Sequence, residues 1–379
     1  MLRVLGIGLR LLAWIFRHFP LQRRVVMLSR QGSKPSVDFL MLKDKLAEID
    51  TALPVIIRCT KPEQHGIMQL IGPMCNQLWY ACTSRVVILD GYNPCICIPP
   101  KRRGVFVIQL WHAVGAVKKF GYQSLDTPAG RSSSYAKLAH MHQNYDLIVS
   151  TGLGSKQAYS EAFGYPAEKI VSLGLPRIDN LYAAPSKEHV KKLLAKDYPW
   201  LCNGNKNILY APTLRTAHIK DNWAEDAICK LARSIAPLPV NLIVSKHPLT
   251  TLKNPKELPS NVFVMLGHQT EELLQLADVV ISDYSAIALE AGIVGCPVLF
   301  YMPDYEEYRL SPGLNIDPMK DNQLFGTALA SEIAEVLNNP IALRYIQSEF
   351  ANFINTYFTG LNRHSTERVI QLICKHIDK

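Results

Sequence analysis

The sequence lacks the features of disordered and fibrous proteins. Charged residues make up only 19% of its 379 residues, and it contains neither low-complexity tracts nor an internal repeat. Apolar residues reach 48%, so a chain of this length can bury a large core. Length and composition together predict two compact α/β domains.

Short motifs of several enzyme classes are also missing. The nine cysteines are scattered, and no CxxC pair or Cys/His spacing suits zinc. We interpret them as reduced thiols of a cytosolic protein. No GxSxG or HExxH motif supports a hydrolase. Gly152 and Gly154 follow a predicted strand, but the third glycine of the dinucleotide fingerprint and the residues of a Walker loop are absent, so we reject a nicotinamide or ATP site there.

Acidic residues are outnumbered, 32 against 41 basic ones, which gives a net charge of +9. Such a balance calls for an anionic partner: nucleic acid, an acidic lipid surface or a phosphorylated substrate. Aromatic residues are not interleaved with basic runs as nucleic-acid stacking platforms would be. We therefore expect no nucleic-acid partner, while a basic membrane- or nucleic-acid-binding protein without catalysis remains the alternative of another class.

Long hydrophobic runs are missing even from the apolar N-terminal segment. In residues 1–20 the uninterrupted apolar runs, Val4 to Leu9 and Leu11 to Phe16, fall far below the roughly 20 residues of a membrane-spanning helix. Trp14 suits a membrane interface. We predict an amphipathic helix that lies on the membrane surface without crossing it, at the cytoplasmic face of a bacterial cell membrane.

Arginines accompany this segment. Arg3, Arg10 and Arg17 recur at intervals of seven, which places them on one stripe of a helix. Three more arginines follow closely and would strengthen attraction to anionic lipid: Arg23, Arg24 and Arg30. A signal anchor and an ordinary amphipathic helix packed on the protein stay open as alternatives.

Beyond Pro20, short runs of β-branched residues recur at helix-length intervals, the βαβ pattern of a parallel sheet. The first series is Val25 to Leu28, Pro54 to Arg58, Val86 to Leu89, Val105 to Leu110, Leu147 to Ser150 and Ile170 to Leu173. The second is Ile208 to Ala211, Val240 to Ser245, Val262 to Leu266, Val279 to Ser282 and Val298 to Tyr301. The sequence therefore predicts two Rossmann-like, doubly wound domains.

A polar, lysine-rich stretch from Ala183 to Asn207 separates the two series. We predict a membrane-associating helix over residues 1–20, an N-terminal domain over 21–185, a linker over 186–206 and a C-terminal domain over 207–379. The last part, from about Arg344, is expected to be helical with a break near Thr359 and Gly360.

Chemically informative residues follow predicted strands. Open parallel sheets bind ligands at the carboxyl ends of their strands, so these residues are expected to gather at one cleft. They are Trp111 and His112, then Thr213 and Arg215, then Lys246 and His247, and last Asp283 and Ser285. A single histidine after a strand is more often a structural cap, but four strand ends from two domains favour a site.

The residue types suggest a reaction on phosphate. Neutral His112 can take a proton from an attacking hydroxyl. Lys118 and Lys119 could hold an anionic acceptor, or could be a solvated pair. Arg215 can fork onto phosphate oxygens, and Ser285 with the following helix N-terminus could cradle a diphosphate without a metal. A further residue, Glu290, could accept hydrogen bonds from ribose hydroxyls, or could be an exposed helix charge.

Five motifs in this order resemble the CDP-glycerol glycerophosphotransferase family of teichoic acid and capsule polymer synthesis, most closely its short, primase-type members. They are QLWHAVGAVKKFG, LGLPRID, YAPTLR, SKHP and SDYSAIALEAGIVGCPVLFYMPDYEEY, between Val105 and Tyr308, with a weaker echo in GLNRHSTERV. The resemblance implies a GT-B fold with a central cleft. It also implies that His112 is the base, that His247 meets the donor phosphates, and that Asp283, Ser285 and Glu290 hold the nucleotide.

The chain departs from the family pattern at two places. The usual WHGT reads Trp111, His112, Ala113 and Val114, which affects acceptor contacts there. Ala286 replaces the second serine of DYSS and removes one phosphate ligand.

The expected reaction moves glycerol phosphate from CDP-glycerol onto a hydroxyl of an undecaprenyl-diphosphate-linked saccharide and releases CMP. Donor binding is assigned to the C-terminal domain, through Thr213, Arg215, Lys246, Asp283, Ser285 and Glu290, with His112 and His247 catalytic. Acceptor binding is assigned to the N-terminal domain, through Trp111, Lys118 and Lys119. CDP-ribitol as donor, or a GT-B enzyme that uses a UDP-sugar, are the enzymatic alternatives.

No tightly bound cofactor is expected. No cluster of ligands requires a resident metal, although Mg²⁺ could travel with the donor diphosphate. The sequence leaves a homo-oligomer open.

Overall fold

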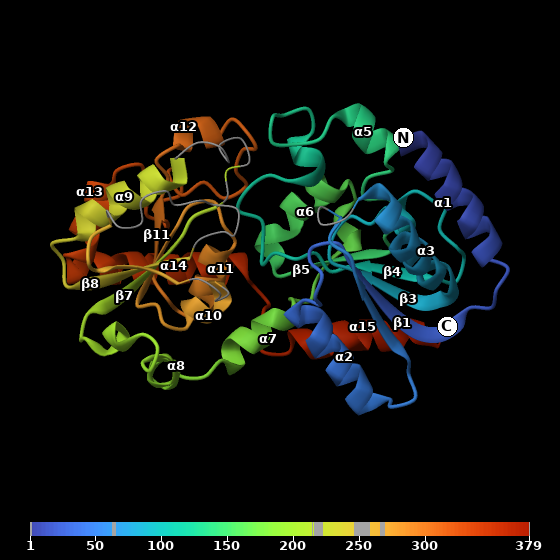
Figure 1. Ribbon diagram of the computed structural model, residues 1–379, viewed down its shortest axis with the longest axis horizontal. Coiled ribbons are helices and arrows are strands. Elements are labelled where there is room, and N and C mark those ends of the chain that lie inside the picture. Colours follow the sequence, from blue (N-terminus) through green and yellow to red (C-terminus); the bar gives the residue numbers. More distant parts are fainter. Residues whose placement is uncertain are drawn as a thin grey trace. The chain divides into compact units, whose positions relative to one another are not determined.

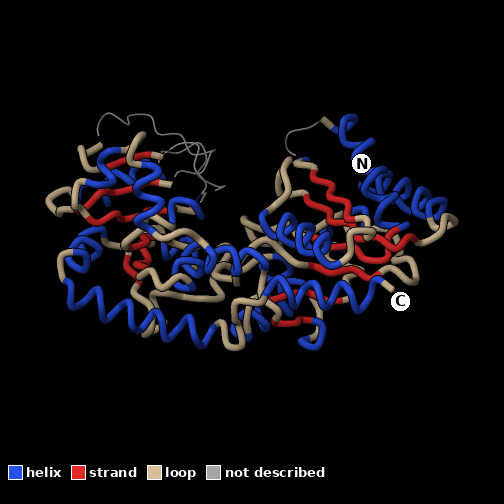
Figure 2. The backbone as a smooth tube through the Cα atoms, turned by 90° about the horizontal axis from the view of Figure 1, so that it is seen from below, coloured by secondary structure: helices blue, strands red, loops and turns tan. Residues whose placement is uncertain are grey.

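A computed structural model describes residues 2–62, 66–213, 215, 223–245, 258–265 and 270–378. The chain divides into two compact units (Figure 1). Unit 1 comprises residues 1–113, 120–180 and 358–379, and unit 2 comprises residues 114–119 and 181–357. Both are α/β units in which helices lie on either side of a parallel sheet (Figure 2).

The sheet of unit 1 has the strand order β2-β1-β3-β4-β5-β6, and each pair is parallel. Its strands are β1 (Gln22–Ser29), β2 (Val55–Cys59), β3 (Ser84–Leu89), β4 (Phe106–Gln109), β5 (Leu147–Ser150) and β6 (Ile170–Ser172). The chain reverses its direction of winding between β1 and β3, which is therefore the topological switch point of this sheet.

The helices of unit 1 pack on both faces of that sheet. They are α1 (Leu2–Phe16), α2 (Val37–Ile49), α3 (Ile67–Thr83), α4 (Pro94–Cys97), α5 (Ser133–Leu138), α6 (Lys156–Phe163) and α15 (Ser365–Ile377), with α7 (Pro176–Ala183) at the boundary. Short 3₁₀ turns are η2 (Gly121–Ser124), η3 (Leu153–Ser155) and η4 (Ala167–Lys169). The predicted strands of this unit are confirmed to within three residues at their ends.

The sheet of unit 2 is also parallel, with the order β12-β11-β10-β7-β8-β9. Its strands are β7 (Lys206–Ala211), β8 (Val240–Val244), β9 (Val262–Val264), β10 (Val279–Ser282), β11 (Val298–Tyr301) and β12 (Gly326–Thr327). The switch point lies between β7 and β10. The short β12 was not predicted, because Gly and Thr over two residues carry no hydrophobic period.

Helices cover this second sheet and close its core. They are α8 (Lys187–Leu194), α9 (Trp223–Ile235), α10 (Thr270–Leu274), α11 (Ile287–Ile293), α12 (Tyr305–Tyr308), α13 (Ala330–Leu337) and α14 (Pro340–Tyr357), with the 3₁₀ turn η5 (Pro199–Cys202). The core contains fully buried residues from α9 and from β7, β8 and β10, such as Leu231, Ile208 and Leu242.

The assignment of residues 207–379 to one C-terminal domain needs correction. The predicted break is present, since α14 ends at Tyr357 and α15 begins at Ser365, but α15 packs on α2, β1 and β3 of unit 1 (Figure 1). His376 of α15 stacks on Phe106 of β4 at 3.6 Å between ring centroids. A helical pattern records which face is apolar and not which sheet it covers, so sequence could not place this helix.

The helix α1 carries apolar residues on two sides, one buried and one exposed. Leu9 and Ala13 are buried against Leu78 of α3 and its neighbours. An outer stripe stays exposed, and its members recur at helical spacing: Val4, Ile7, Leu11 and Trp14, which are 72%, 69%, 58% and 62% exposed. Across the described ranges, every helix is too short or too polar to span a bilayer.

Two of the arginines expected to attract lipid are engaged within unit 1. Arg24 is buried, and its guanidinium donates to the hydroxyls of Ser84 and Thr83. Arg23 pairs with Asp50 and Asp378 at 2.7 and 2.6 Å. The sequence-based expectation is therefore wrong for Arg24, because a strand residue next to the switch point faces the interior.

Candidate active site

Both sheets carry predicted residues at the carboxyl ends of their strands, in unit 2 at the switch point between β7 and β10, and in unit 1 one strand away from the switch point between β1 and β3. In unit 1, Trp111 and His112 follow β4, beside the residues that follow β3. In unit 2, Thr213 and Arg215 follow β7, and Asp283 and Ser285 follow β10. A crevice forms at such a point because the loops on its two sides run in opposite directions.

The ring of His112 is oriented by a backbone carbonyl. Its Nδ1 lies 2.8 Å from the carbonyl oxygen of Asp90. A carbonyl can only accept, so Nδ1 carries the proton and Nε2 carries the lone pair of the neutral ring. The geometry therefore leaves His112 in the tautomer that a general base with Nε2 as acceptor needs.

Asp90 also brings a buried carboxyl group close to this turn. Its side chain is 2% exposed, and within the described residues neither carboxyl oxygen has a hydrogen-bond partner. Burial raises the pKa of the Asp90 carboxyl to about 6. Sequence reasoning missed this residue, although it directly follows a predicted strand.

Trp111 adopts a left-handed backbone conformation, with φ of 64°, which is rare for a residue with a side chain. Its indole stacks on Phe120, with 4.9 Å between ring centroids, and the centroid of the His112 imidazole lies 4.1 Å away. The ring forms one wall beside His112. Its part in acceptor binding stays a prediction.

Arg215 is enclosed in unit 2 and is only 7% exposed. Nε donates to Asp304 at 2.6 Å, Nη2 to Asp283 at 2.8 Å, and Nη1 to the carbonyl of Thr213 at 2.7 Å. Three aromatic rings surround the guanidinium, those of Trp223, Tyr284 and Tyr308, at 4.3 to 4.9 Å from their centroids.

The charge of Arg215 is matched inside this cluster. Burial alone would lower the pKa of the guanidinium, but the carboxylates of Asp283 and Asp304 outweigh it, and the pKa is raised. The predicted fork onto phosphate would require Arg215 to exchange these partners. In this structure Arg215 instead links Thr213 to the carboxylates of Asp283 and Asp304.

Asp283 is fully buried and saturated with hydrogen bonds. Its carboxylate accepts from the backbone nitrogen and the hydroxyl of Thr213, at 3.0 and 2.6 Å, and from its neighbour's backbone nitrogen at 2.6 Å. With Arg215 as a further donor, few lone pairs are left for a ligand. Asp283 therefore ties the ends of β7 and β10 together, and any contact it makes with a nucleotide remains a prediction.

Sequence reasoning missed Asp304, the second carboxylate of this cluster. It lies just beyond β11 and also accepts from the hydroxyl of Tyr284 at 3.1 Å. Tyr284 in turn stacks on Tyr308 at 3.6 Å. The signal was available, because Asp304 follows a predicted strand within three residues, as the other site residues do.

Ser285 and Glu290 lie at the start of α11 and within it. The hydroxyl of Ser285 accepts from the backbone nitrogen of Ile287 at 3.4 Å, and Ser285 directly precedes Ala286, the N-cap residue of this seven-residue helix. Glu290 is 4% exposed, and every residue of α11 is buried. This excludes an exposed helix charge and leaves the nucleotide contact as a prediction.

Lys118 and Lys119 were assigned to the acceptor side with the N-terminal domain, but the segment 114–119 belongs to unit 2. The backbone of Lys118 forms an isolated antiparallel β-bridge with that of Leu314, and the backbone nitrogen of Lys119 donates to the carbonyl of Gly313 at 2.9 Å. Removal from water lowers the pKa of the Lys118 ammonium, although the side chain keeps exposed surface. The negative charge of nearby Asp283 offsets part of this lowering. Lys118 therefore lies near the Arg215 cluster.

Gly115 explains why this segment stays in unit 2. Its φ is +78°, and an added Cβ would lie 2.6 Å from Leu289 and 2.9 Å from the ring of Tyr357. The hydroxyl of Tyr357 accepts from the backbone nitrogen of Ala116 at 3.0 Å. A side chain at position 115 would break this packing.

Two predicted site residues, Lys246 and His247, lie outside the described residues. In the described part of the chain, no group of three or more His, Cys, Asp or Glu is arranged to hold a metal ion.

Two motifs of the resemblance are structural within unit 1. Asp38 of α2 accepts from the backbone and side chain of Arg177, both at 2.8 Å. Asp179 caps α15 by accepting from the backbone nitrogens of Ser365 and Thr366, at 3.0 and 2.7 Å. LGLPRID and the later STERV therefore contact each other within unit 1.

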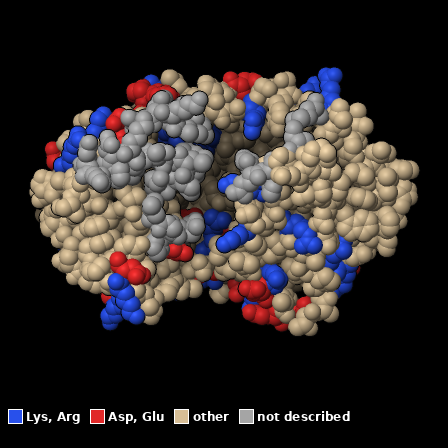
Figure 3. All heavy atoms as spheres, viewed as in Figure 1, with Lys and Arg blue, Asp and Glu red and all other residues tan. Residues whose placement is uncertain are grey.

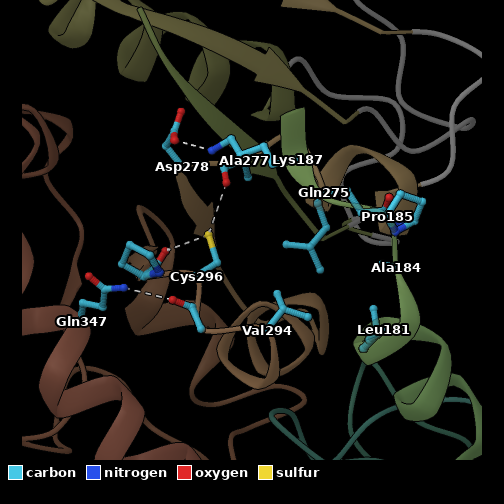
Figure 4. Close-up of a pocket in the computed structure, with 13 residues that line it drawn as sticks. Leu181, Ala184, Pro185, Lys187, Gln275, Ala277, Asp278, Val294, Cys296 and Gln347 are labelled. Carbon is cyan, nitrogen blue, oxygen red and sulfur yellow. Dashed lines mark hydrogen bonds and ion pairs between the residues drawn. The ribbon is translucent and has the colours of Figure 1, made fainter. Parts of the chain in front are cut away.

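A cavity of about 400 Å³ in unit 2 lies away from these residues, at the amino ends of β10 and β11 (Figure 4). Its polar groups are paired with one another: Lys187 with Asp278, and Gln347 with the carbonyl of Gly295 at 3.0 Å. It lies at the opposite edge of the sheet from Asp283, so it is not the predicted donor site.

Charged side chains on the surface are dispersed. On the described part of the face in Figure 3, Lys and Arg form small separate groups among uncharged residues and not one continuous basic stripe.

The chain matches the model of the family described as CDP-Glycerol:Poly(glycerophosphate) glycerophosphotransferase over residues 11–375. It is 31% identical over 315 residues to a teichoic acid ribitol-phosphate primase of Bacillus spizizenii, covering 80% of this chain and 79% of the primase. A teichoic acid glycerol-phosphate primase of the same organism is 28% identical over 300 residues, covering 78% and 75%.

Solved structures support the same fold. The wall teichoic acid polymerase TagF matches with a TM-score of 0.71 and 17% identity, over 99% of this chain and 96% of that chain. A UDP-GlcNAc 2-epimerase from Neisseria meningitidis matches with a TM-score of 0.62 and 15% identity, over 93% and 100%. The fold is thus shared with sugar-nucleotide enzymes, while the match along nearly the whole chain places it in the CDP-glycerol glycerophosphotransferase family, among the transferases of teichoic acid synthesis.

Proposed function

We propose that this protein transfers a polyol phosphate from a CDP-polyol to a hydroxyl of a lipid-linked saccharide and releases CMP. The observation that carries the proposal is the His112 turn, whose ring has Nδ1 turned to the carbonyl of Asp90 and therefore offers Nε2 as the base. Family membership supplies the class of donor.

In the proposed step, Nε2 of His112 takes the proton of the acceptor hydroxyl. The hydroxyl oxygen forms a bond to the phosphorus that carries the polyol, while the bond from that phosphorus to the bridging oxygen breaks. CMP leaves with the electron pair, and the imidazolium returns its proton to solvent. Cations near the donor stabilise the leaving phosphate, and Lys118 and the predicted His247 are the candidates.

Glycerol phosphate is the first candidate for the transferred group, because the family description names CDP-glycerol. Ribitol phosphate is the second, because a teichoic acid ribitol-phosphate primase is 31% identical to this chain over 315 residues. Within one fold, a pocket can be reshaped for a longer polyol by a few side chains.

The test is CMP release from CDP-glycerol and CDP-ribitol, each with a lipid-linked amino-sugar disaccharide and with UDP-sugars as control donors. We expect acceptor-dependent CMP release that falls about 10²- to 10⁴-fold in His112→Ala, the usual loss for a positioned base. UDP release, or near-normal turnover by His112→Ala, would contradict the proposal.

We also propose that α1 rests on an anionic membrane surface. The support is the outer stripe of Val4, Ile7, Leu11 and Trp14, which stays exposed although the same helix packs on α3. Residues of this kind at one surface bury apolar area in the headgroup region and bring the lipid-linked acceptor to the enzyme.

Sedimentation with vesicles of anionic phospholipid tests this contact. The double variant Ile7→Ser with Leu11→Ser should lose most of its vesicle binding, because it removes two apolar anchors. Ile341→Ser is the matched control, since Ile341 is 75% exposed on α14 of unit 2. Equal loss in both variants would contradict a specific role of α1.

A further inference from the structure

The end of β3 is tied to the His112 turn by three parallel contacts. Three consecutive carbonyls, those of Leu89, Asp90 and Gly91, each accept from one group of the segment 109–112. Leu89 accepts from the backbone nitrogen of Leu110 at 2.7 Å, and Asp90 from the ring of His112 at 2.8 Å. Gly91 accepts from Nε2 of Gln109 at 3.1 Å.

Gln109 makes a second contact inside the turn itself. Its Oε1 accepts from the backbone nitrogen of Trp111 at 3.0 Å. Because one partner is a carbonyl and the other an N–H group, the orientation of the amide is fixed without ambiguity. Gln109 is fully buried, so solvent does not compete for these bonds.

The turn that Gln109 holds is a strained one. Trp111 has a φ of 64°, a conformation that is unfavourable for a residue with a side chain and persists only where its surroundings enforce it. The bond from Trp111 to Gln109 enforces it from inside unit 1. Gly91, whose carbonyl accepts from Gln109, lies beside the ring of His112, since a Cβ at position 91 would be 4.0 Å from Nδ1 of His112.

We infer that Gln109 is the positioning residue of the proposed base. Its amide spans the end of β3 and the Trp111–His112 turn, and so keeps Nδ1 of His112 on the carbonyl of Asp90, which makes Nε2 the ring atom that can accept the proton of the acceptor hydroxyl. This inference rests on the proposed function. It assigns Gln109 no contact with substrate.

Two variants separate positioning from folding. Gln109→Met keeps the length of the side chain but can neither donate nor accept. Gln109→Glu can still accept from Trp111, but it can donate to Gly91 only when it is protonated. Gln77→Met is the matched control, because Gln77 is also buried in unit 1 and its side chain bonds to Asn93 and Thr60 and not to residues 109–112.

We expect Gln109→Met to lower kcat about 10- to 100-fold, part of the effect of losing a base, with the KM of the donor changed less than about twofold. Gln109→Glu should regain activity relative to Gln109→Met as the pH falls, because protonation restores the donor. Gln77→Met should keep the kcat of the wild type. If Gln109→Met unfolds in a melting experiment, the pH-dependent rescue in Gln109→Glu decides.

A second readout does not need activity. In ¹⁵N NMR spectra of histidine-labelled protein, with His112→Ala used for assignment, the wild type should show His112 protonated at Nδ1, and Gln109→Met should show a mixture of tautomers. A shift in tautomer without CMP release by the wild type would sink the proposed function and keep the inference. Wild-type turnover and an unchanged tautomer in Gln109→Met would overturn the inference.

Discussion

The two sheets hold the loops at the carboxyl ends of their strands by different means. In unit 1, neutral groups hold the loops after β3 and β4: the amide of Gln109, the ring of His112 and backbone carbonyls. In unit 2, charge holds the loops after β7, β10 and β11, with Arg215 between the carboxylates of Asp283 and Asp304.

The difference follows from what each edge must do. A base needs a ring whose proton stays on one nitrogen, and a hydrogen bond from that nitrogen to a backbone carbonyl fixes this. Loops that surround an anionic donor need rigidity, and a buried ion pair resists opening because an unmatched charge in the interior is costly. We therefore expect substitutions at the His112 turn of unit 1 to lower the reaction rate, and substitutions in the Arg215 cluster of unit 2 to lower the free energy of unfolding.

Removing Arg215 should give the largest effect on folding. Arg215→Met leaves two carboxylates buried without their cation, and loss of one partner of a buried pair costs about 3–5 kcal/mol. Urea unfolding measures the change. Arg309→Met is the control, because Arg309 pairs with Glu306 on the surface, where such a pair contributes about 0–1 kcal/mol. Equal losses would break the comparison.

Asp90 should make the stability of unit 1 depend on pH. Its folded pKa of about 6 lies above the ordinary value of 3.8, so the folded state binds the proton more tightly. The contribution of protonated Asp90 to the free energy of unfolding is therefore fully present below about pH 4. It is lost as the pH rises through about 6, and the loss amounts to up to about 3 kcal/mol.

Asp90→Asn should abolish this loss and be more stable than the wild type at pH 7. Melting temperatures between pH 4 and pH 8 provide the measurement. Asp50→Asn should be less stable than the wild type at pH 7. The hydrogen bond from Arg23 lowers the pKa of Asp50, so the stabilisation by ionised Asp50 is present at neutral pH and lost as the pH falls. A flat profile for the wild type would refute the role of Asp90.

Replacing Lys118 should give the smallest effect, and the result shows whether this lysine binds the donor or the acceptor. If it meets the donor beside the Arg215 cluster, Lys118→Met should raise the KM of the CDP-polyol about fivefold, the equivalent of an exposed charge contact, and leave the KM of the acceptor unchanged. Initial rates with each substrate varied in turn measure this. A rise in the KM of the acceptor alone would restore the assignment made from sequence.

The fold could be predicted because its signal is local. Each buried parallel strand is a short β-branched run, such as Val279 to Ser282, and helix-length intervals imply crossovers between them. Residues that follow strands, such as His112 and Asp283, could be found for the same reason. The position of α15 on unit 1 could not, because its packing partner lies more than 250 residues away in the sequence.

The individual roles at the site could be predicted less well than their location. An arginine after a strand has the chemistry to bind phosphate, but whether it does so depends on Asp304, which reaches it from another strand end. Lys118 follows the His112 motif by six residues, yet its segment packs in unit 2 because of Gly115 and Tyr357. Such partnerships are set by tertiary packing, which one sequence does not reveal.

The packing of α15 also fixes the order in which the protein can mature. During synthesis a domain usually folds as soon as it has emerged from the ribosome. Here unit 1 is begun first, but the face of its sheet covered by α15 stays bare until residues 365–377 have been made, after all of unit 2. The unit that carries His112 is therefore the last to be completed, and a ribosome that stalls after Tyr357 would leave a nascent chain whose second unit is whole and whose first exposes apolar surface to chaperones.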